Sequence, residues 1–581
     1  MPKRFVLEIT PEQIKAMLVR GKAALPEDDF KLVHAMAEVI ERSNEILRDR
    51  HASVARMRRL FGLGRSEKTA DLRAKAKKAA SEAAACGASQ NSTAATTPAE
   101  ATTEPLSTTE PPAMTPTPPE AKPKRKGHGR IPSSAYRAAE HIAVPHESLQ
   151  HGDPCPDCAM GNVYDLPCAP ILRIVGQAPL WATCWDAGRV RCGACGTVFT
   201  AQLPAEAQGE KYDETAVSMI AVLHCGNGMP FHRLDKLQSN LDTPVPASTQ
   251  WEVLQQAVPL VEPAYNELVR LAAQAELLHI DDSHMRILSL MGKRREQLIA
   301  NGQLDTPERT GLYTTAIIAV VAVLGVIALF FTGRKHAGEN LAALLTKRAK
   351  GLPLPLVMSD ALPHNVPEGL QVIESNCLAH GRRKFVDEFE DFPQECLHVL
   401  GQLGLVYKLD NECKHQRVSD AERLRRHQLH SAPIMDALQK WMTEKIDAKL
   451  IEPNSGLGRD FNYFLKRWEK FTVFLRVPGA PLDNNICERG LKMAIRLRKA
   501  SLFYRSERGA RVGDIYMTLI HTAELHGQNP FDYLTELQRN HKAVAETPAD
   551  WLPWTYKATL TRIRLARASP PAGSTTSRIA A

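Results

Sequence analysis

The spacing of apolar positions changes several times along the chain and predicts different elements. Across residues 1–85, side chains such as Leu32, Met36, Val39 and Ile46 recur three, four or seven residues apart. This spacing places them on one helical face among charged neighbours. The pattern predicts an N-terminal helical region, either a short coiled coil or an ordinary helical hairpin.

One segment near the middle of the chain is wholly apolar. Ala316–Phe331 spans sixteen residues without a polar side chain and has Gly325 near its middle. It is shorter than the ~18–20 residues that cross a membrane, and it is rich in Val and Ile. It therefore predicts two buried strands joined by a tight turn, with a membrane helix as the alternative.

The flanking segments predict further strands and helices. Leu354–Met358 has the pattern of a strand, while residues 386–449 and 484–499 have helical spacing. Two short helices are also expected within residues 206–272, one opened by Met229–Leu234 and one by Thr249–Trp251. Two such helices joined by a turn resemble a helix-turn-helix, so this region is a candidate for DNA binding.

Length and composition indicate several folded units and one unfolded segment. The chain has 581 residues, more than the ~100–200 of a typical domain. Apolar residues make up 44% and charged residues 24%, as in soluble globular proteins. Within residues 91–120, however, sixteen of thirty residues are Thr or Pro. Such a stretch cannot bury enough surface to offset its ordering entropy, so residues 86–121 are predicted to be a disordered linker.

The charge is informative only where it is concentrated. Lys and Arg number 73 against 65 Asp and Glu, and a net charge of +8 is too weak over this length to indicate nucleic-acid binding. A basic run follows the linker, with Lys122, Lys124, Arg125, Lys126 and Arg130. Such a run is either a solvated tether or a phosphate contact. Lys124, Arg125 and Lys126 are accordingly candidate DNA-binding residues.

Four of the twelve cysteines form two Cys-x-x-Cys pairs, Cys155 with Cys158 and Cys192 with Cys195. Two such pairs can direct four thiolates tetrahedrally at Zn²⁺. A redox pair and buried unreactive thiols are the alternatives. Residues 122–205 are therefore predicted to hold the basic run and a zinc-ribbon-like module with structural zinc. The N-terminal residues lack an apolar secretory segment, so a reducing, cytoplasmic setting is expected.

Three carboxylates stand in settings that suit metal binding. Asp281 and Asp360 each end an apolar run with the pattern of a buried strand, and Glu488 lies one turn inside a helix expected to begin near Asp483. Two strand-end aspartates and a helical glutamate can hold two hard cations ~3.5–4 Å apart, which suits displacement at a phosphodiester. Carboxylates at strand ends are also commonly just solvated.

The residues after Glu488 are strongly basic. Residues 489–511 include eight basic side chains and one acid. On a helix, Lys492, Arg496 and Lys499 share a stripe with Glu488. A cationic stripe beside a metal-binding carboxylate suits a polyanionic substrate, and a solvated basic helix is the alternative.

Many ordered motifs resemble the transposases of the insertion sequence 66 family. These motifs are Asp483–Arg489, Arg498–Lys499, Ile520–Leu525, Asn529–Leu534, Asn376–Phe385, Phe331–Arg334, His336–Asn340 and Glu452–Gly458. The similarity continues N-terminally through Gly127–Arg130, the cysteine pairs and Phe61–Lys68, and so covers nearly everything except the linker.

The resemblance implies a multidomain α+β protein with a ribonuclease-H-like catalytic domain of the DDE type. This domain would span residues 273–540 with a helical insertion at about 386–475, and residues 541–581 would form a C-terminal basic tail. Asp281, Asp360 and Glu488 would be the catalytic triad. The family's first aspartate is usually followed by Glu-Thr-Pro, whereas Asp282-Ser283-His284 follows Asp281 here.

The family's chemistry further implies a cofactor and partners. Two Mg²⁺ ions, with Mn²⁺ as an alternative, would activate water to cut at the transposon end and then the freed 3′-hydroxyl to attack target DNA. Arg489, Lys492, Arg496 and Lys499 would neutralise phosphates. The zinc module and the helical region would bind the element's ends. A homo-oligomeric synaptic complex and accessory proteins of the element are expected, in the bacterial cytoplasm at the nucleoid.

Two rival interpretations remain open on the sequence. One is a catalytically inactive, zinc-containing DNA-binding protein derived from a transposase. The other is a membrane protein anchored at Ala316–Phe331, which does not explain the soluble pattern of the flanking segments; no membrane partner is expected.

Overall fold

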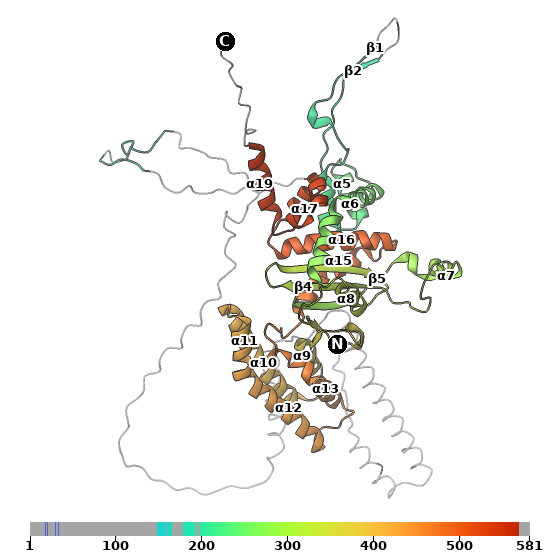
Figure 1. Ribbon diagram of the computed structural model, residues 1–581, viewed down its shortest axis with the longest axis vertical. Coiled ribbons are helices and arrows are strands. Elements are labelled where there is room, and N and C mark those ends of the chain that lie inside the picture. The colour runs from blue at the N-terminus through green and yellow to red at the C-terminus, as the bar shows by residue number, and fades with distance from the viewer. Residues whose placement is uncertain are drawn as a thin grey trace, which may run out of the picture.

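The computed structural model describes residues 148–157, 160–164, 178–191, 195 and 198–568, together with residues 18, 20, 30 and 33. Apart from those four positions, the predicted N-terminal helical region lies outside the described residues, as do the linker and the basic run that contains Lys124, Arg125 and Lys126. The described part has a mixed α/β fold, in which helices surround one five-stranded sheet (Figure 1).

The central sheet has the strand order β5-β4-β3-β6-β7. The strands are β3 (Leu277–His284), β4 (Tyr313–Val321), β5 (Gly325–Gly333), β6 (Leu356–Ser359) and β7 (Ile373–Asn376). Strands β3, β4 and β5 pair antiparallel, whereas β6 runs parallel to both β3 and β7. The carboxyl ends of β3, β6 and β7 therefore lie at the same edge of the sheet.

The apolar run Ala316–Phe331 forms the β4–β5 hairpin, as predicted. Val321 pairs with Gly325 at the end of the hairpin, and Gly325 has φ of +97°, a conformation that favours glycine. The inner residues of both strands are fully buried, which explains why the run lacks polar alternation. The membrane-helix alternative is wrong for this segment. Every helix in the described part of the chain is too short or too polar to cross a bilayer.

Helix α16 (Glu507–Leu525) covers the outer edge of the sheet along β5. Its side chains bond the strand at four-residue intervals: Asp514 accepts from Thr332 N at 2.6 Å, Thr518 Oγ1 from Phe330 N at 3.1 Å, and Thr522 Oγ1 from Ala328 N at 3.2 Å. Four helical residues advance ~6 Å, close to the ~6.8 Å of two strand residues, so successive turns meet alternate strand amides. These hydrogen bonds occupy backbone amides of the edge strand β5, so another strand cannot pair with it there.

One hydrophobic core joins the sheet to helices that precede its strands in the sequence and to helices that follow them. These helices are α4 (Glu214–Ala221), α5 (Phe231–Asn240), α6 (Ala247–Ala272), α15 (Asn485–Ser501), α17 (Pro530–Arg539), α18 (His541–Glu546) and α19 (Tyr556–Ala568). Leu268, Ile317, Tyr516 and Trp551 are all buried in this core. The helical region predicted for residues 206–272 thus packs against the sheet layer, and residues 541–568 of the predicted basic tail are largely helical.

A second core lies in the helical segment between β7 and α15, drawn below the sheet in Figure 1. The helices of this segment are α9 (Leu378–Asp387), α10 (Pro393–Gln416), α11 (Asp420–Arg426), α12 (Ala432–Asp447), α13 (Gly456–Leu465) and α14 (Trp468–Phe471). Phe385, Val399, Met435 and Phe461 are fully or almost fully buried within it. The prediction that residues 386–449 are mainly helical is confirmed.

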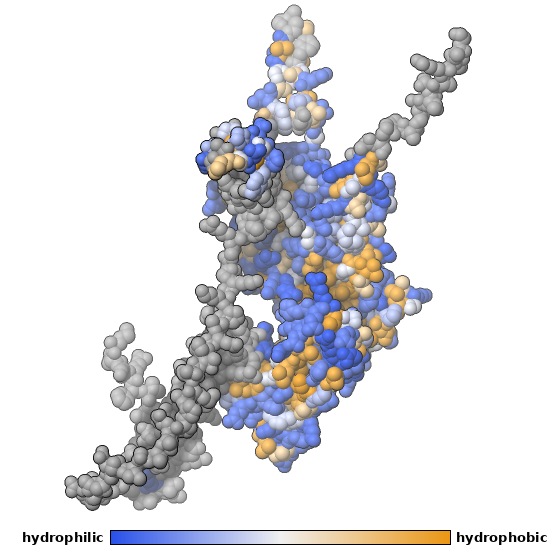
Figure 2. All heavy atoms as spheres, turned by 90° about the vertical axis from the view of Figure 1, so that its left-hand side faces the viewer, coloured by the Kyte–Doolittle hydropathy of each residue, from blue (hydrophilic) through white to orange (hydrophobic). Residues whose placement is uncertain are grey.

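Smaller elements complete the described part. They are β1 (Arg189–Arg191), β2 (Val198–Thr200), α7 (Gly292–Ala300), α8 (Ala337–Leu345) and the short helices η3 (Ala205–Ala207), η4 (Val222–Gly226), η5 (Leu288–Leu290), η6 (Pro363–Asn365), η7 (His427–Ser431), η8 (Val473–Leu475) and η9 (Pro548–Trp551). The face drawn in Figure 2 is largely hydrophilic, and its apolar side chains gather in separate patches.

Candidate active site

The sheet places Asp281 and Asp360 side by side. In the parallel pairing of β3 with β6, His279 is the register partner of Met358. Asp281 and Asp360 each follow this last pair by two residues, and the charge of Asp360 helps to raise the pKa of Asp281, so the two carboxylates lie near each other. Partners in a parallel pair point to the same face, so both carboxylates project together at the carboxyl edge of the sheet. Strand β3 itself continues to His284 because β4 still pairs with it, so Asp281 is not the strand end that the sequence predicted.

Helix α15 brings Glu488 to the same face. Asn484 precedes the helix, and its side chain donates to Ile280 O at 2.9 Å and bonds His279 Nδ1 at 3.0 Å. Farther along, Arg498 donates to Ser283 Oγ at 2.9 Å. His279, Asp281 and Ser283 alternate onto one face of β3, so α15 lies over the face that carries Asp281. Glu488, in the first turn of α15, lies close enough for its charge to help raise the pKa of Asp281.

The helix begins one residue later than predicted. The cap position is Asn484, and Asp483 instead accepts a hydrogen bond from Asn485 N at 3.1 Å. Asn484 is fully buried between β3 and α9, where its own amide also donates to Cys377 Sγ at 3.2 Å. These bonds hold the start of α15 in place, and with it Glu488.

The carboxylates perturb one another electrostatically. Burial raises the pKa of Asp281 to about 7, with further increases from Asp360, Asp282 and Glu488 that outweigh a hydrogen bond from the Asp282 amide. Burial also raises the pKa of Asp360, while His380 lowers it. A carboxyl that titrates near neutrality beside like charges is typical of a functional site, because such a cluster becomes stable when a cation or proton enters it.

Asp282 points to the opposite face of β3. Its Oδ2 accepts from Ala337 N at 3.2 Å, at the start of α8. Neighbouring strand residues alternate between faces, so only Asp281 of this pair shares a face with the start of α15. Asp281, the aspartate that the sequence analysis selects, thus lies on the face of β3 that α15 covers, and Asp282 lies on the other.

The structure also adds His380 to the site. His380, on α9, has its Nε2 3.7 Å from Glu488 Oε1. The two residues line a pocket of about 280 Å³ with Tyr407 and Asn485. His380 Nδ1 and Tyr407 Oη are buried without a hydrogen-bond partner among the described residues. His380 belongs to the motif Asn376–Phe385 that resembles the transposase family. No local sequence pattern predicts, however, that it lies beside a helix that begins about a hundred residues later.

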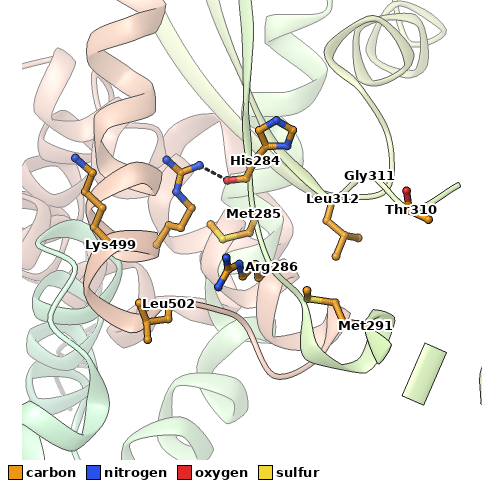
Figure 3. A pocket seen from close by; sticks show the side chains of 10 residues that line it. His284, Met285, Arg286, Met291, Thr310, Gly311, Leu312, Lys499 and Leu502 are labelled. Carbon is orange, nitrogen blue, oxygen red and sulfur yellow. Dashed lines mark hydrogen bonds between the residues drawn. The ribbon is translucent and has the colours of Figure 1, made fainter. Parts of the chain in front are cut away.

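Four predicted DNA-binding residues form one exposed stripe on α15. Arg489, Lys492, Arg496 and Lys499 are all exposed, and none forms an ion pair within the part of the chain that the structure describes. A pocket of about 530 Å³ lies at the carboxyl end of this stripe. In Figure 3, Lys499 and Leu502 lie on one side of it and Leu312 and Met291 on the other, while Arg498 donates to His284 O.

The predicted zinc ligands fall only partly within the described residues. Cys155 and Cys195 are described, and Cys158 and Cys192 lie outside. The cysteine cluster therefore stays a prediction.

One family of known proteins matches the segments that carry the candidate site. The sequence model of the family "Transposase IS66 family" matches residues 210–300 and 326–512, segments that contain Asp281, Asp360 and Glu488. The chain belongs to this transposase family.

Curated relatives match a shorter stretch. "Uncharacterized protein y4jD" of Sinorhizobium fredii (strain NBRC 101917 / NGR234) is 32% identical over 187 residues, which cover 31% of this chain and 36% of the relative. "Uncharacterized protein y4hP" of the same strain is 27% identical over 199 residues, covering 31% and 35%. The chain thus spans about a third of the length of the curated relatives it matches.

Proposed function

We propose that the protein is a DDE-type transposase that binds the ends of an insertion sequence and catalyses metal-dependent DNA cleavage and strand transfer. The observation that carries this proposal is that Asp360 and Glu488 lie close enough to Asp281 for their charges to help raise its pKa, near the carboxyl end of β6 and the first turn of α15. The five-stranded mixed sheet, with its helical insertion before Glu488, supports a ribonuclease-H-like domain.

The acidic residues fit Mg²⁺, with Mn²⁺ as an alternative. Three carboxylates lie near one edge of the sheet, and burial, followed by the charges of Asp360, Asp282 and Glu488, raises the pKa of Asp281. Hard cations such as Mg²⁺ prefer carboxylate oxygens. Asp281, Asp360 and Glu488 would hold two ions, which lower the pKa of an oxygen nucleophile and stabilise the charge on the leaving oxygen.

The rest of the chain would position DNA around these carboxylates. Paired strands fix Asp281, the loop after β6 fixes Asp360, and the bonds of Asn484 fix the helix that carries Glu488. The stripe Arg489, Lys492, Arg496 and Lys499 extends from Glu488 along exposed surface, where it would neutralise backbone phosphates. This arrangement would hold the DNA backbone close to the three carboxylates. The reaction would need no covalent protein nucleophile.

Recognition of the element's ends and pairing of subunits would involve the parts of the chain that precede the central sheet. We assign end recognition to the cysteine module, with structural Zn²⁺ on Cys155, Cys158, Cys192 and Cys195, and to the pair α5 and α6. The basic residues Lys124, Arg125 and Lys126 would add phosphate contacts. Subunit pairing through the N-terminal region would form the synaptic complex.

Mg²⁺ affinity is expected to rise with pH up to about 7. The pKa of Asp281 in the metal-free protein is raised to about 7, so below that pH an entering cation must displace a proton. If one proton is displaced, Mg²⁺ affinity rises about tenfold for each pH unit between pH 5 and 7 and does not change further above pH 7. Calorimetric titration with Mg²⁺ at several pH values measures this slope. Asp281→Asn should bind more weakly with a shallower slope, and an affinity independent of pH in the wild type would contradict the assignment.

Removing part of the α15 stripe is expected to reduce the salt dependence of DNA binding. If Lys492 and Arg496 each contact a phosphate, the double variant Lys492→Ala/Arg496→Ala lowers the slope of log affinity against log salt by about 2. Fluorescence anisotropy with duplex DNA over a range of salt concentrations gives that slope. The matched control is Lys408→Ala/Lys440→Ala, which removes two exposed lysines from the helical insertion. Equal slopes for the two double variants would show that α15 does not face the DNA.

A further inference from the structure

A second group of metal-ligand side chains converges on the opposite side of β3 from Asp281. Asp282 comes from β3, His336 from the residue that caps α8, and His364 from η6. One ligand atom of each lies within 4.8 Å of the others. His336 Nδ1 is 3.4 Å from Asp282 Oδ2, and the rings of His336 and His364 have centroids 4.6 Å apart. Three segments distant in sequence thus bring two imidazoles and one carboxylate together.

We propose that Asp282, His336 and His364 bind a divalent transition-metal ion of the Zn²⁺ type. Imidazole nitrogen is a ligand that Zn²⁺ and its first-row neighbours accept readily, whereas Mg²⁺ prefers oxygen. Two atoms that are each ~2.0–2.1 Å from a tetrahedral zinc lie about 3.4 Å apart, which matches the separation of His336 Nδ1 and Asp282 Oδ2. Three protein ligands leave a fourth position for water.

The surroundings hold these ligands in place while leaving the site accessible. The Ala337 amide donates to Asp282 Oδ2, and the His336 amide donates to Glu339 at 2.9 Å. Arg309 in turn donates twice to Glu339, at 2.8 and 2.9 Å. His364 is exposed and the other two ligands are half-buried, so an ion can enter from solvent. Such secondary hydrogen bonds orient ligands in known metal sites.

An ion here would brace the segment that carries Asp360. His364 lies in the loop directly after β6, and its neighbour Asn365 donates to both carboxylate and carbonyl oxygens of Asp360. Binding would tie that loop to β3 and to the start of α8. The site uses none of the three proposed catalytic carboxylates, so this inference does not depend on the proposed function.

Zn²⁺ binding by the full chain provides the test. Metal-depleted wild type is expected to bind one more equivalent of Zn²⁺ than His336→Ala/His364→Ala, measured by elemental analysis after equilibrium dialysis. The single variant His364→Ala should weaken this equivalent at least about tenfold. Because His364 is exposed, its truncation leaves the core intact and keeps the test valid if the double variant does not fold.

Two controls separate this site from the other metal sites. His284→Ala removes a histidine of the same strand that is not in the cluster; its ring lies tilted against Tyr313, with the centroids 5.2 Å apart. This variant should bind as much Zn²⁺ as wild type. Cys155→Ser/Cys192→Ser removes the predicted cysteine site, so Co²⁺ bound to this variant should show visible absorption without thiolate charge-transfer bands. Loss of all metal in the cysteine variant, or equal Zn²⁺ binding by His364→Ala and His284→Ala, would overturn the proposal.

Discussion

Glu488→Gln is expected to reduce strand cleavage of DNA by at least about 100-fold, because a carboxylate that holds a catalytic ion supplies several kcal/mol of transition-state stabilisation. The substitution keeps the size of the side chain. Glu488 is 36% exposed, and its carboxylate oxygen lies 3.7 Å from His380 Nε2, so the fold should not depend on its charge. Binding to duplex DNA should therefore persist while cleavage is lost.

The measurement is cleavage of DNA that carries the element's ends, with Mg²⁺ present. The matched control is Glu507→Gln, an exposed glutamate in the first turn of α16, the helix that follows α15. This control should cleave like wild type. Equal cleavage by Glu488→Gln and wild type would remove Glu488 from the mechanism. DNA binding without cleavage in the wild type itself would favour the alternative of an inactive DNA-binding protein derived from a transposase.

Asp410→Asn is expected to lower the free energy of unfolding of the helical insertion by about 3–5 kcal/mol, the range for breaking a buried ion pair from one side. Asp410 is 1% exposed and sits between Arg423 NH2 at 2.6 Å, Lys414 Nζ at 2.7 Å and His427 Nε2 at 3.3 Å. Without the carboxylate charge, the largely buried Arg423 guanidinium has no anionic partner in this cluster.

Burial would raise the pKa of Asp410, but the hydrogen bond from His427 and the charges of Arg423 and Lys414 outweigh burial and hold it below its ordinary value. A lowered folded-state pKa means that the contribution is present above the ordinary value of 3.8 and disappears as the pH falls through the lowered value. The difference between variant and wild type should thus be full at neutral pH and shrink in strong acid.

Denaturant unfolding at neutral pH, followed by hydrogen exchange of α10 and α12, measures this effect. Glu412→Gln is the matched control, because Glu412 lies on the same helix and pairs with Lys408 at 3.9 Å, but is 51% exposed. Exposed pairs contribute less than ~1 kcal/mol, so the control should unfold almost as wild type does. If both variants lost the same stability, the buried cluster would have no special role in holding the insertion together.

Much of the sheet was predictable because its information is local. The run Ala316–Phe331 has no polar residue and a glycine near its middle, and strand burial on both faces requires that pattern. The starts of α5, α6 and α15 were likewise indicated by proline and polar residues beside helical spacing. The end of β3 was misjudged by three residues, because pairing with β4 extends the strand beyond its apolar part.

The sequence alone was enough to predict which residues would carry chemistry: the acids Asp281, Asp360 and Glu488, and the cationic stripe that follows Glu488. Only the tertiary structure decided which of them meet. The parallel pairing of β3 with β6, two strands about eighty residues apart, brings Asp281 and Asp360 near each other, and α15 covers the face of β3 that carries Asp281 rather than Asp282. The physical reason is that apolar spacing depends on adjacent residues, whereas strand register and helix placement depend on contacts between distant ones. His380 beside Glu488 and the group Asp282, His336 and His364 arise only from such contacts.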